Sequence, residues 1–315
     1  MPELKRRTLL GLITSLPIFG RCADAGPPSF ALVPAFESGQ RWRFEFERKV
    51  VRAGAVLQWY RAPLHVRVLE TDADGALLEW VEGAQAIVDV DPRRRPLLEL
   101  GLAATREVPL RLRVDASGRV QSLANAAEVR GLCLGLMDAM ATQLGTDPDA
   151  REVIDMMLPA MKAAYASDEM VAAATLREPM ILFGAMGRRF GADEPVEFRT
   201  VLDNPLGGPP LPAIARFAIR AVQPRARRAE LGWLMVTDPH AMTASAQAGV
   251  DTAARMVADA LDDDPARIAL PPVSLEERGD FVVDTASAWP ARVTHVRSTR
   301  VGALAQTDST SFTRA

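Results

Sequence analysis

The side chains best suited to metal binding or nucleophilic catalysis are few and widely spaced in this sequence. Its 315 residues include three histidines, His65, His240 and His295, and two cysteines, Cys22 and Cys133. No two histidines share a helical turn, whereas zinc sites commonly take ligands from closely spaced positions. The spacing argues against a zinc site, and we expect His65 and His295 to be hydrogen-bonded or exposed in strands.

Other catalytic and metal-binding patterns are also poorly matched. Asp72-x-Asp74-Gly75 resembles the start of a calcium loop, but the third oxygen ligand and the later glutamate are missing, so a hairpin turn fits better. The sequence contains no Gly-x-Ser-x-Gly elbow and no glycine-rich phosphate loop. Asp262-Asp263-Asp264 is interpreted as the solvated end of a helix. We therefore expect a protein that is not an enzyme, with no metal and no cofactor.

Methionine gives the most informative functional pattern. Eight of the twelve methionines lie between Met137 and Met186. Methionine is unbranched and adaptable, so it fits both an irregular core and a deformable wall that accepts varied apolar ligands. Both interpretations stay open for this segment. The candidate ligand-facing residues are Met137, Met140, Met156, Met157, Met161, Tyr165 and Phe183.

Charge and composition exclude several classes of partner. The sequence has 37 basic and 40 acidic residues, a formal net charge of -3, and lacks the basic excess of a nucleic-acid binder. Its 48% hydrophobic and 24% charged residues are ordinary for a soluble globular protein. Arginine supplies most of the positive charge, with tight clusters at 93–95 and 225–228 that could meet a phosphate or simply be solvated.

The N-terminus reads as an export signal over residues 1–25. Lys5, Arg6 and Arg7 precede an apolar stretch over 9–19, which is shorter than the roughly 20 residues that span a bilayer. Ala23-Asp24-Ala25 then fits a signal-peptidase site. The arginine pair resembles a twin-arginine signal, although an ordinary secretory signal stays an alternative. Lipidation at Cys22 would bring peripheral membrane contact, but Arg21 fits that pattern poorly.

Residues 26–315 are expected to form a single α+β domain. Trp42, Phe44 and Phe46 alternate with charged residues, which predicts a strand with one buried face. About eleven such strands, joined in part by tight turns at 71–75 and 115–118, predict a large curved antiparallel sheet resembling a half-barrel. Apolar residues at three- and four-residue steps predict a helical insertion at about 125–190, packed on one face, and a further helix over about 243–261. Pro63 predicts a bulge or an edge position within a strand over about 57–70.

Several signatures resemble exported bacterial proteins of unknown function that are similar to lipoprotein-carrier proteins of the LolA and LppX type. They are Phe36-x-x-Gly39-x-x-Trp42-x-Phe44-x-Phe46, the turns Asp74-Gly75 and Ser117-Gly118 with Asn125 after the return strand, and Gly279-Asp280-Phe281-x-x-Asp284 followed by Trp289-Pro290. The resemblance implies a half-barrel covered by helices around an apolar cavity.

The expected function is that of a periplasmic or secreted, non-enzymatic binder of a lipid or other apolar small molecule. The alternative is a structural or protein-interaction module of the cell envelope, whose partner would be an envelope protein. A third hypothesis is a hydrolase whose catalytic site matches no known motif. An apolar hollow under the helical block would favour the first, a packed interior with an exposed apolar strip would favour the second, and a polar cleft with convergent carboxylates would favour the third.

Overall fold

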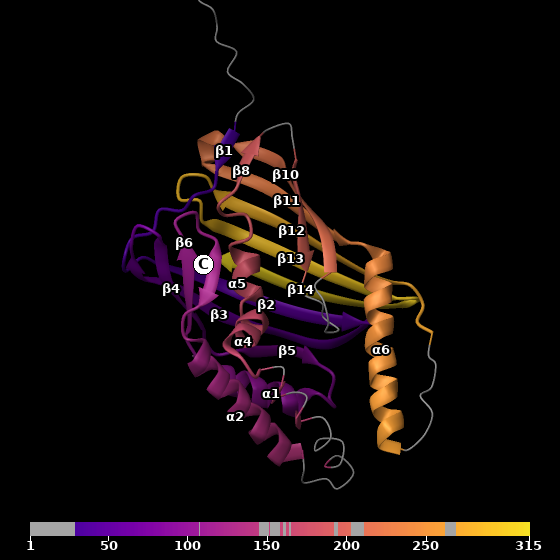
Figure 1. Ribbon diagram of the computed structural model, residues 1–315. Helices are drawn as coiled ribbons and strands as arrows, with labels where there is room; N and C mark the ends of the chain where they lie inside the picture. Colours follow the sequence, from indigo (N-terminus) through magenta and orange to yellow (C-terminus); the bar gives the residue numbers. More distant parts are fainter. Residues whose placement is uncertain are drawn as a thin grey trace, which may run out of the picture.

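A single large antiparallel sheet organises the protein (Figure 1). The computed structural model describes residues 29–106, 108–144, 151, 158–159, 162–163, 165–191, 195–202, 211–261 and 269–315. Twelve strands within these residues form the sheet, and β1 and β8 pair separately. The strands are β1 (Ser29–Ala31), β2 (Arg41–Arg52), β3 (Ala55–Thr71), β4 (Gly75–Glu82), β5 (Ala86–Val90), β6 (Leu110–Asp115), β7 (Val120–Leu123), β8 (Arg189–Gly191), β9 (Val196–Leu202), β10 (Leu211–Gln223), β11 (Arg228–Thr237), β12 (Val273–Asp284), β13 (Pro290–Val301) and β14 (Leu304–Arg314).

The first long strand and the last strand lie side by side in the middle of the sheet. Neighbouring strands follow the order β7-β6-β4-β3-β2-β14-β13-β12-β11-β10-β9, with β5 beside β3. The first long strand, β2, pairs with the last strand, β14, so two antiparallel meanders meet there. The path ends at β7 and β9, and the sheet is not closed. The predicted α+β class and half-barrel-like sheet are confirmed.

The strand count differs from the prediction for a local reason. We expected one strand over about 76–90 after the turn at 71–75, but these residues form two strands, β4 and β5, which pair with β3 at different places along its length. Pro63 lies where the neighbour of β3 changes, since β4 pairs from Leu64 onward and β5 pairs up to Arg61. The carbonyl of Pro63 accepts a hydrogen bond from Gly83 on that side at 2.8 Å. Proline has no N–H group to donate, and Pro63 lies between the segments of β3 that pair with β4 and β5, so little hydrogen bonding between strands is lost there.

Alternation of side chains decides which face of the sheet is buried. On β2, Phe44 and Phe46 are buried while Arg43 and Glu45 are exposed. Successive side chains of a strand point to opposite faces, so this pattern confirms the predicted register of the first long strand. Trp42 lies on the same face and is partly buried against the core. We call this buried side the inner face of the sheet.

Aspartate side chains make the two predicted hairpin turns. Asp72 Oδ1 accepts hydrogen bonds from the backbone N–H groups of Asp74 and Gly75, both at 2.9 Å. Asp115 Oδ1 accepts from the N–H groups of Ser117 at 2.9 Å and Arg119 at 3.0 Å. These contacts close turns between β3 and β4 and between β6 and β7, and they explain Asp72 without a calcium ion.

The helices cover the inner face. They are α1 (Arg95–Thr105), α2 (Ala126–Leu144), α4 (Asp168–Thr175), α5 (Arg177–Leu182) and α6 (Pro239–Leu261), with a 3-10 turn η1 (Pro224–Ala226). In Figure 1, α4 and α5 lie in front of the middle of the sheet, and α1 and α2 lie towards its lower end. Of the helices in the described ranges, none is long and apolar enough to cross a membrane.

Helix α1 was not predicted from the sequence, and neither were the short strands β1 and β8. Helix α1 begins at the arginine cluster, with Pro96 in its first turn, where a missing N–H costs nothing. Helix α6 begins at Pro239, earlier than predicted, and packs against β12 through Met242, Ala246 and Leu275. Helices α2, α4 and α5 confirm helical structure in the predicted insertion, most of whose middle, 145–164, lies outside the described residues.

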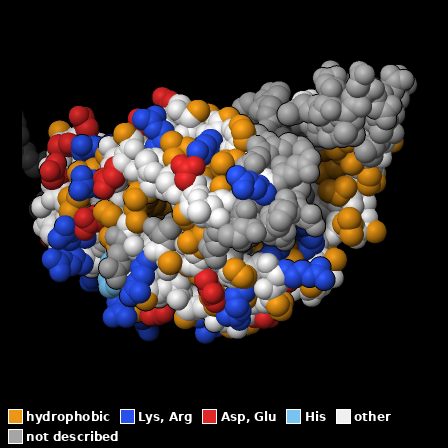
Figure 2. Space-filling model, turned by 90° about the horizontal axis from the view of Figure 1, so that it is seen from below, with side chains coloured by type: hydrophobic (Ala, Val, Ile, Leu, Met, Phe, Trp, Pro, Cys, Tyr) orange, Lys and Arg blue, Asp and Glu red, His pale blue; other side chains and the backbone are white. Residues whose placement is uncertain are grey.

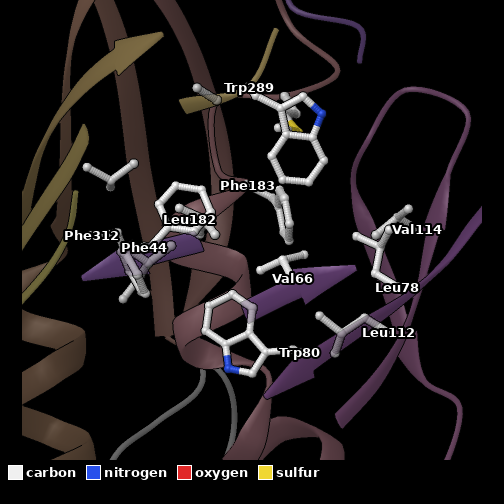
Figure 3. Packing of buried hydrophobic residues seen from close by; sticks show 14 of the residues in the cluster. Phe44, Val66, Leu78, Trp80, Leu112, Val114, Leu182, Phe183, Trp289 and Phe312 are labelled. Carbon is white, nitrogen blue, oxygen red and sulfur yellow. The ribbon is translucent and has the colours of Figure 1, made fainter. Parts of the chain in front are cut away.

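Aromatic side chains from distant strands fill the core between the sheet and α5 (Figure 3). Phe312 of β14 lies 5.2 Å from Phe46 and 5.8 Å from Trp80, measured between ring centroids. Phe183, directly after α5, meets the ring of Trp289 edge-on at 5.5 Å. Together these contacts hold the N-terminal strands, the C-terminal strands and the helical block in one packed unit.

Ion pairs between neighbouring strands cover the outer face of the sheet. Examples are Arg61–Glu47 at 2.6 Å, Arg67–Glu79 at 3.1 Å and Arg216–Glu197. In the view of Figure 2, Lys and Arg side chains also lie among Asp and Glu side chains, with hydrophobic side chains between them. Much of the abundant arginine on the sheet is therefore balanced locally by carboxylates.

Candidate functional site

A hollow of about 230 Å³ lies between the inner face of the sheet and the helices. Its floor comes from β2, β3 and β4, and its walls come from α1, α2, α4 and the start of α5. The floor includes the rings of Phe46 and Trp80, both almost fully buried. This is the apolar space beneath helices that the ligand-binding interpretation requires.

One face of α2 forms the apolar wall. Val129, Leu132, Cys133 and Leu136 line the hollow, and their three- and four-residue steps place them on one side of a helix. Val129 is buried, whereas Leu132 is 45% exposed, which is unusual for leucine and marks the outer edge of this wall. The stripe thus continues from the core to the surface through the hollow.

Asn125 holds the start of α2 against the sheet. Asparagine at the start of a helix commonly caps it with its side chain. Here, Asn125 Oδ1 instead accepts a hydrogen bond from the backbone N–H of Arg111 at 2.9 Å, and its Nδ2 donates to the carbonyl of Pro109 at 2.9 Å. The backbone carbonyl of Asn125 still accepts the first helical bond, from Val129. The side chain therefore pins the helix to β6 and sets the position of the apolar wall.

The inner end of the hollow is charged. Arg48 of β2 donates through Nη1 to Glu178 Oε1 at 3.2 Å and through Nη2 to Asp308 Oδ2 at 3.0 Å. Arg177 Nη1 also donates to Asp308 Oδ2, at 2.9 Å. Arg48 and Glu178 line the hollow, while Arg177 and Asp308 lie behind them. Tyr60 lines the same end and packs edge-on against Phe46.

Burial and the neighbouring arginines shift the pKa values of Asp308 and Tyr60 in opposite directions. Burial alone would raise the pKa of Asp308, but the guanidinium groups of Arg48 and Arg177 outweigh it and hold that pKa below its ordinary value. Burial raises the pKa of the Tyr60 hydroxyl, and Arg48 offsets only part of that rise. The arginine-paired carboxylate is thus ionised, and the tyrosine is neutral, at neutral pH.

Glu82 behaves differently from the other carboxylates. It lies at the end of β4, lines the hollow and makes no ion pair with any residue in the described ranges. Burial, with a further contribution from the negative charge of Glu178, raises the pKa of Glu82 to about 7, although a hydrogen bond with Trp80 acts in the other direction. The hollow therefore contains a carboxylate that changes charge near neutral pH.

A second hollow of about 530 Å³ adjoins the first. Tyr60, Thr105 and Leu136 line both, so the two spaces meet at these side chains. Its remaining lining comes mainly from α1 and from Gln58 and Val90 of the neighbouring strands. Helix α1 therefore contributes to both spaces, and a ligand too large for the first hollow could extend into the second.

The described candidates from the methionine-rich segment lie beside the hollow rather than in its lining. Met137 is buried, Met140 is half-buried, and Tyr165 is half-buried against the core. Phe183 is a core residue in contact with Trp289. Three further candidates, Met156, Met157 and Met161, lie outside the described residues. The predicted ligand wall thus stays a prediction for those three.

The sequence did not assign a binding role to the charged side chains of the hollow, although a signal for them exists. Arg48 continues the inward-facing positions of Phe44 and Phe46, two residues apart, and Glu82 continues the same pattern from Trp80. A charged residue at an inward-facing position must be paired or meet a polar ligand. An inward-facing series of apolar residues at every second position that continues with a charged residue is therefore the sequence pattern that could have indicated this site.

The three histidines do not come together. His65 and His240 are exposed, and His295 is buried with its Nε2 3.2 Å from Glu277 Oε2. Burial would raise the pKa of Glu277, but the hydrogen bond with His295 and the charge of Arg297 hold it below its ordinary value. Within the described ranges, no three histidine, cysteine, aspartate or glutamate side chains are grouped so as to hold a metal ion.

Comparisons with known proteins give little further information. No protein family model matches the sequence, and no curated protein matches it. Among solved structures, the chain is similar to lipovitellin, in a structure described as "Lipid-protein interactions in lipovitellin", with a TM-score of 0.45 and 6% identity. The match covers 89% of this chain and 25% of that chain, so the protein spans about a quarter of its length. A similarity this distant carries no argument about function, and the resemblance to lipoprotein carriers stays a prediction.

Proposed function

We propose that this protein is a non-enzymatic binder of an amphipathic small molecule. The apolar part of the ligand would lie in the hollow beneath α2, and its polar group would meet the charged inner end. The observation that carries this proposal is that one hollow is lined both by an apolar wall, formed by Val129, Leu132 and Leu136, and by the inward-facing charged residues Arg48 and Glu82.

The size of the space supports this assignment. An apolar cavity of about 150 Å³ in another protein is large enough to bind benzene. The first hollow, at about 230 Å³, therefore admits a small apolar body, and the adjoining space of about 530 Å³ extends it. Ligand sites are typically apolar clefts with a few convergent polar groups, which is the composition found here.

Blocking the hollow tests the proposal. Leu136 lines both spaces, so Leu136→Trp should fill them, whereas Leu304→Trp places the same ring at a residue that is 63% exposed on the sheet. We expect the neutral fluorescent probe prodan to bind the wild type and the Leu304 variant, and to bind the Leu136 variant at least tenfold more weakly. Equal binding to all three proteins would contradict the proposed site.

Cys133 offers an independent readout inside the same space. Its thiol lines the hollow, is only half-buried, and is free. A ligand in the hollow should slow the alkylation of Cys133 by N-ethylmaleimide, measured by mass spectrometry on the peptide that contains it. Alkylation that proceeds at the same rate with and without saturating probe would place the bound probe elsewhere.

We also propose that the protein is exported to the periplasm. The support is the N-terminal pattern of Arg6-Arg7, an apolar stretch and Ala23-Asp24-Ala25, all outside the described residues. Replacing both Arg6 and Arg7 by Lys should leave the precursor in the cytoplasm, whereas Arg21→Lys should not. Normal periplasmic amounts of the double variant would contradict the twin-arginine route, and a wild-type protein found only in the cytoplasm would contradict export.

An envelope interaction module is the second candidate function. The observation that favours it is a group of exposed apolar side chains on the outer face near the edge strand β9: Val201 at 65%, Ile214 at 51% and Val236 at 40% exposure. Ile214 pairs directly with Val236 in the register of β10 and β11. A photo-crosslinker at Ile214 should trap one defined envelope protein in cells, and one at exposed Thr313 should not. Identical products from both positions would count against this function.

A further inference from the structure

We infer that the ligand is a hydrophobic amine, with its protonated nitrogen near Glu82 and Glu178. This inference rests on the proposed function, because it concerns the same hollow and names the class of molecule that fits its charged end. Three features carry it: the balance of charges at that end, the contacts that already engage the arginines, and the apolar character of the opposite wall.

Carboxylates outnumber cations at the charged end. The group consists of two guanidinium groups, Arg48 and Arg177, and three carboxylates, Glu82, Glu178 and Asp308. Both arginines contact Asp308, and both also lie within 4 Å of Glu178, at 3.2 and 3.7 Å. Glu82 is left over, and it faces the hollow. When every member is ionised, the group carries one uncompensated negative charge.

Glu82 forms no ion pair with any described residue, and hydrogen bonds with Trp80 and Gln85 and the charge of Arg48 stabilise its ionised form only in part. Burial and the neighbouring Glu178 raise the pKa of Glu82 to about 7, so the ionised form stays unfavourable. A cation placed beside Glu82 would stabilise its ionised form and restore neutrality in a low-dielectric space. The charges at this end of the hollow therefore favour a ligand with a positive group.

An anionic ligand fits the same end poorly. A fatty acid would bring a further carboxylate close to Glu82 and Glu178. Arg48 is the one cation among the described residues that line the first hollow, and it is already bonded to Glu178 and Asp308. Breaking those contacts would leave carboxylates that are largely buried without their cation, which is strongly unfavourable. The acid would thus weaken the network that the amine completes.

The rest of the lining limits the ligand to one charged group. The remainder of the first hollow is lined by uncharged side chains, most of them apolar: Thr105, Val108, Leu110, Val129, Leu132, Cys133, Leu136, Ala174 and Thr175. A second charge on the part of the ligand inside the first hollow would lie against these uncharged side chains without a partner. The ligand is therefore a chain or ring system that ends in a single nitrogen.

Three matched ligands test the inference on the full-length protein. Dodecylamine, dodecanol and dodecanoic acid carry the same chain, and each is titrated below its micellar concentration against bound prodan, with Cys133 alkylation as the second readout. We expect dodecylamine to bind at least tenfold more tightly than dodecanoic acid. Glu82→Gln and Glu178→Gln should each weaken the amine about tenfold and leave dodecanol unchanged, whereas Glu79→Gln, on the opposite face of β4, should change neither.

The outcomes separate this inference from the proposed function. Tighter binding of the acid than of the amine, or an amine affinity that both hollow-facing variants leave intact, would overturn the amine assignment while the hollow stays a binding site. Failure of all three ligands and of prodan to bind would overturn the proposed function itself.

Discussion

The indole ring of Trp233 stacks on the imidazole ring of His295 across a glycine in the strand between them. The ring centroids are 5.3 Å apart, and the planes differ by 28°. Gly279 of β12 pairs with Trp233 on one side and with His295 on the other. A methyl group on Gly279 would lie 3.1 Å from the Trp233 ring and 3.3 Å from the backbone carbonyl of Thr294. The stack therefore depends on a residue without a side chain.

Gly279→Ala should destabilise the protein. The added Cβ would push against the Trp233 ring and against backbone that cannot move aside, so we expect a loss of about 1–3 kcal/mol in the free energy of unfolding. Gly131→Ala is the matched control, because Gly131 lies in α2 with nothing described within 4 Å of the added atom. That variant should gain about 0.5–1 kcal/mol from helix propensity. Urea unfolding measures both, and a stable Gly279 variant would show that the stack can shift.

Phe44→Ala should cost about 3–5 kcal/mol of unfolding free energy, the usual range for truncating a buried aromatic side chain. Phe44 is fully buried in the centre of the sheet, on the joining strand β2. Glu45→Ala is the neighbouring control on the exposed face and should change stability by less than about 0.5 kcal/mol. A loss below about 1 kcal/mol for Phe44→Ala would contradict the burial of this face.

Arg48→Met should also be costly. It would leave Asp308 and Glu178, whose side chains are only 13% and 15% exposed, without one of their cations. Removing one partner of a buried ion pair costs about 3–5 kcal/mol, whereas exposed pairs contribute about 1 kcal/mol or less. Arg216→Met breaks the exposed Arg216–Glu197 pair and serves as the control. Equal losses in chemical denaturation would show that the Arg48 network is not buried in solution.

Glu82→Gln should stabilise the protein in a pH-dependent way. Between about pH 4.5, where the carboxyl group ionises in the unfolded chain, and about pH 7, its pKa in the fold, only the folded state keeps the proton. Stability of the wild type therefore falls as the pH rises through this window and levels off above it. Glutamine does not titrate, so the advantage of the variant should grow from pH 5 to pH 8 and reach on the order of 2 kcal/mol.

Unfolding curves at several pH values measure this difference. Glu79→Gln is the control, because its side chain lies on the opposite face of the same strand, outside the hollow. A constant difference between Glu82→Gln and the wild type across pH 5–8 would mean that Glu82 is hydrated rather than buried.

The hydrophobic period and the turn residues were sufficient to predict the local structure. Phe44 and Phe46 identify the buried face of β2 because side chains alternate along any strand. Asp72 and Asp115 identify turns because a short acidic side chain bonds to backbone N–H groups two to four residues ahead. These relationships involve only neighbours in the chain. Helix α1 was missed even though Pro96 marks its start, because its eleven residues follow directly on a strand and an arginine cluster.

Only the tertiary structure decided where the hollow lies and what charge it carries. Arg48, Glu82, Glu178 and Asp308 come from two strands of the N-terminal meander, a helix of the insertion and the last strand of the sheet. They meet because β2 pairs with β14 and because Glu178 and Arg177 at the start of α5 contact Arg48 and Asp308, and neither relationship follows from local periodicity. A stripe of apolar residues on α2 has the same spacing whether it faces a core or a cavity. The difference depends on how much volume the opposing side chains fill, and that is fixed by residues far away in the chain.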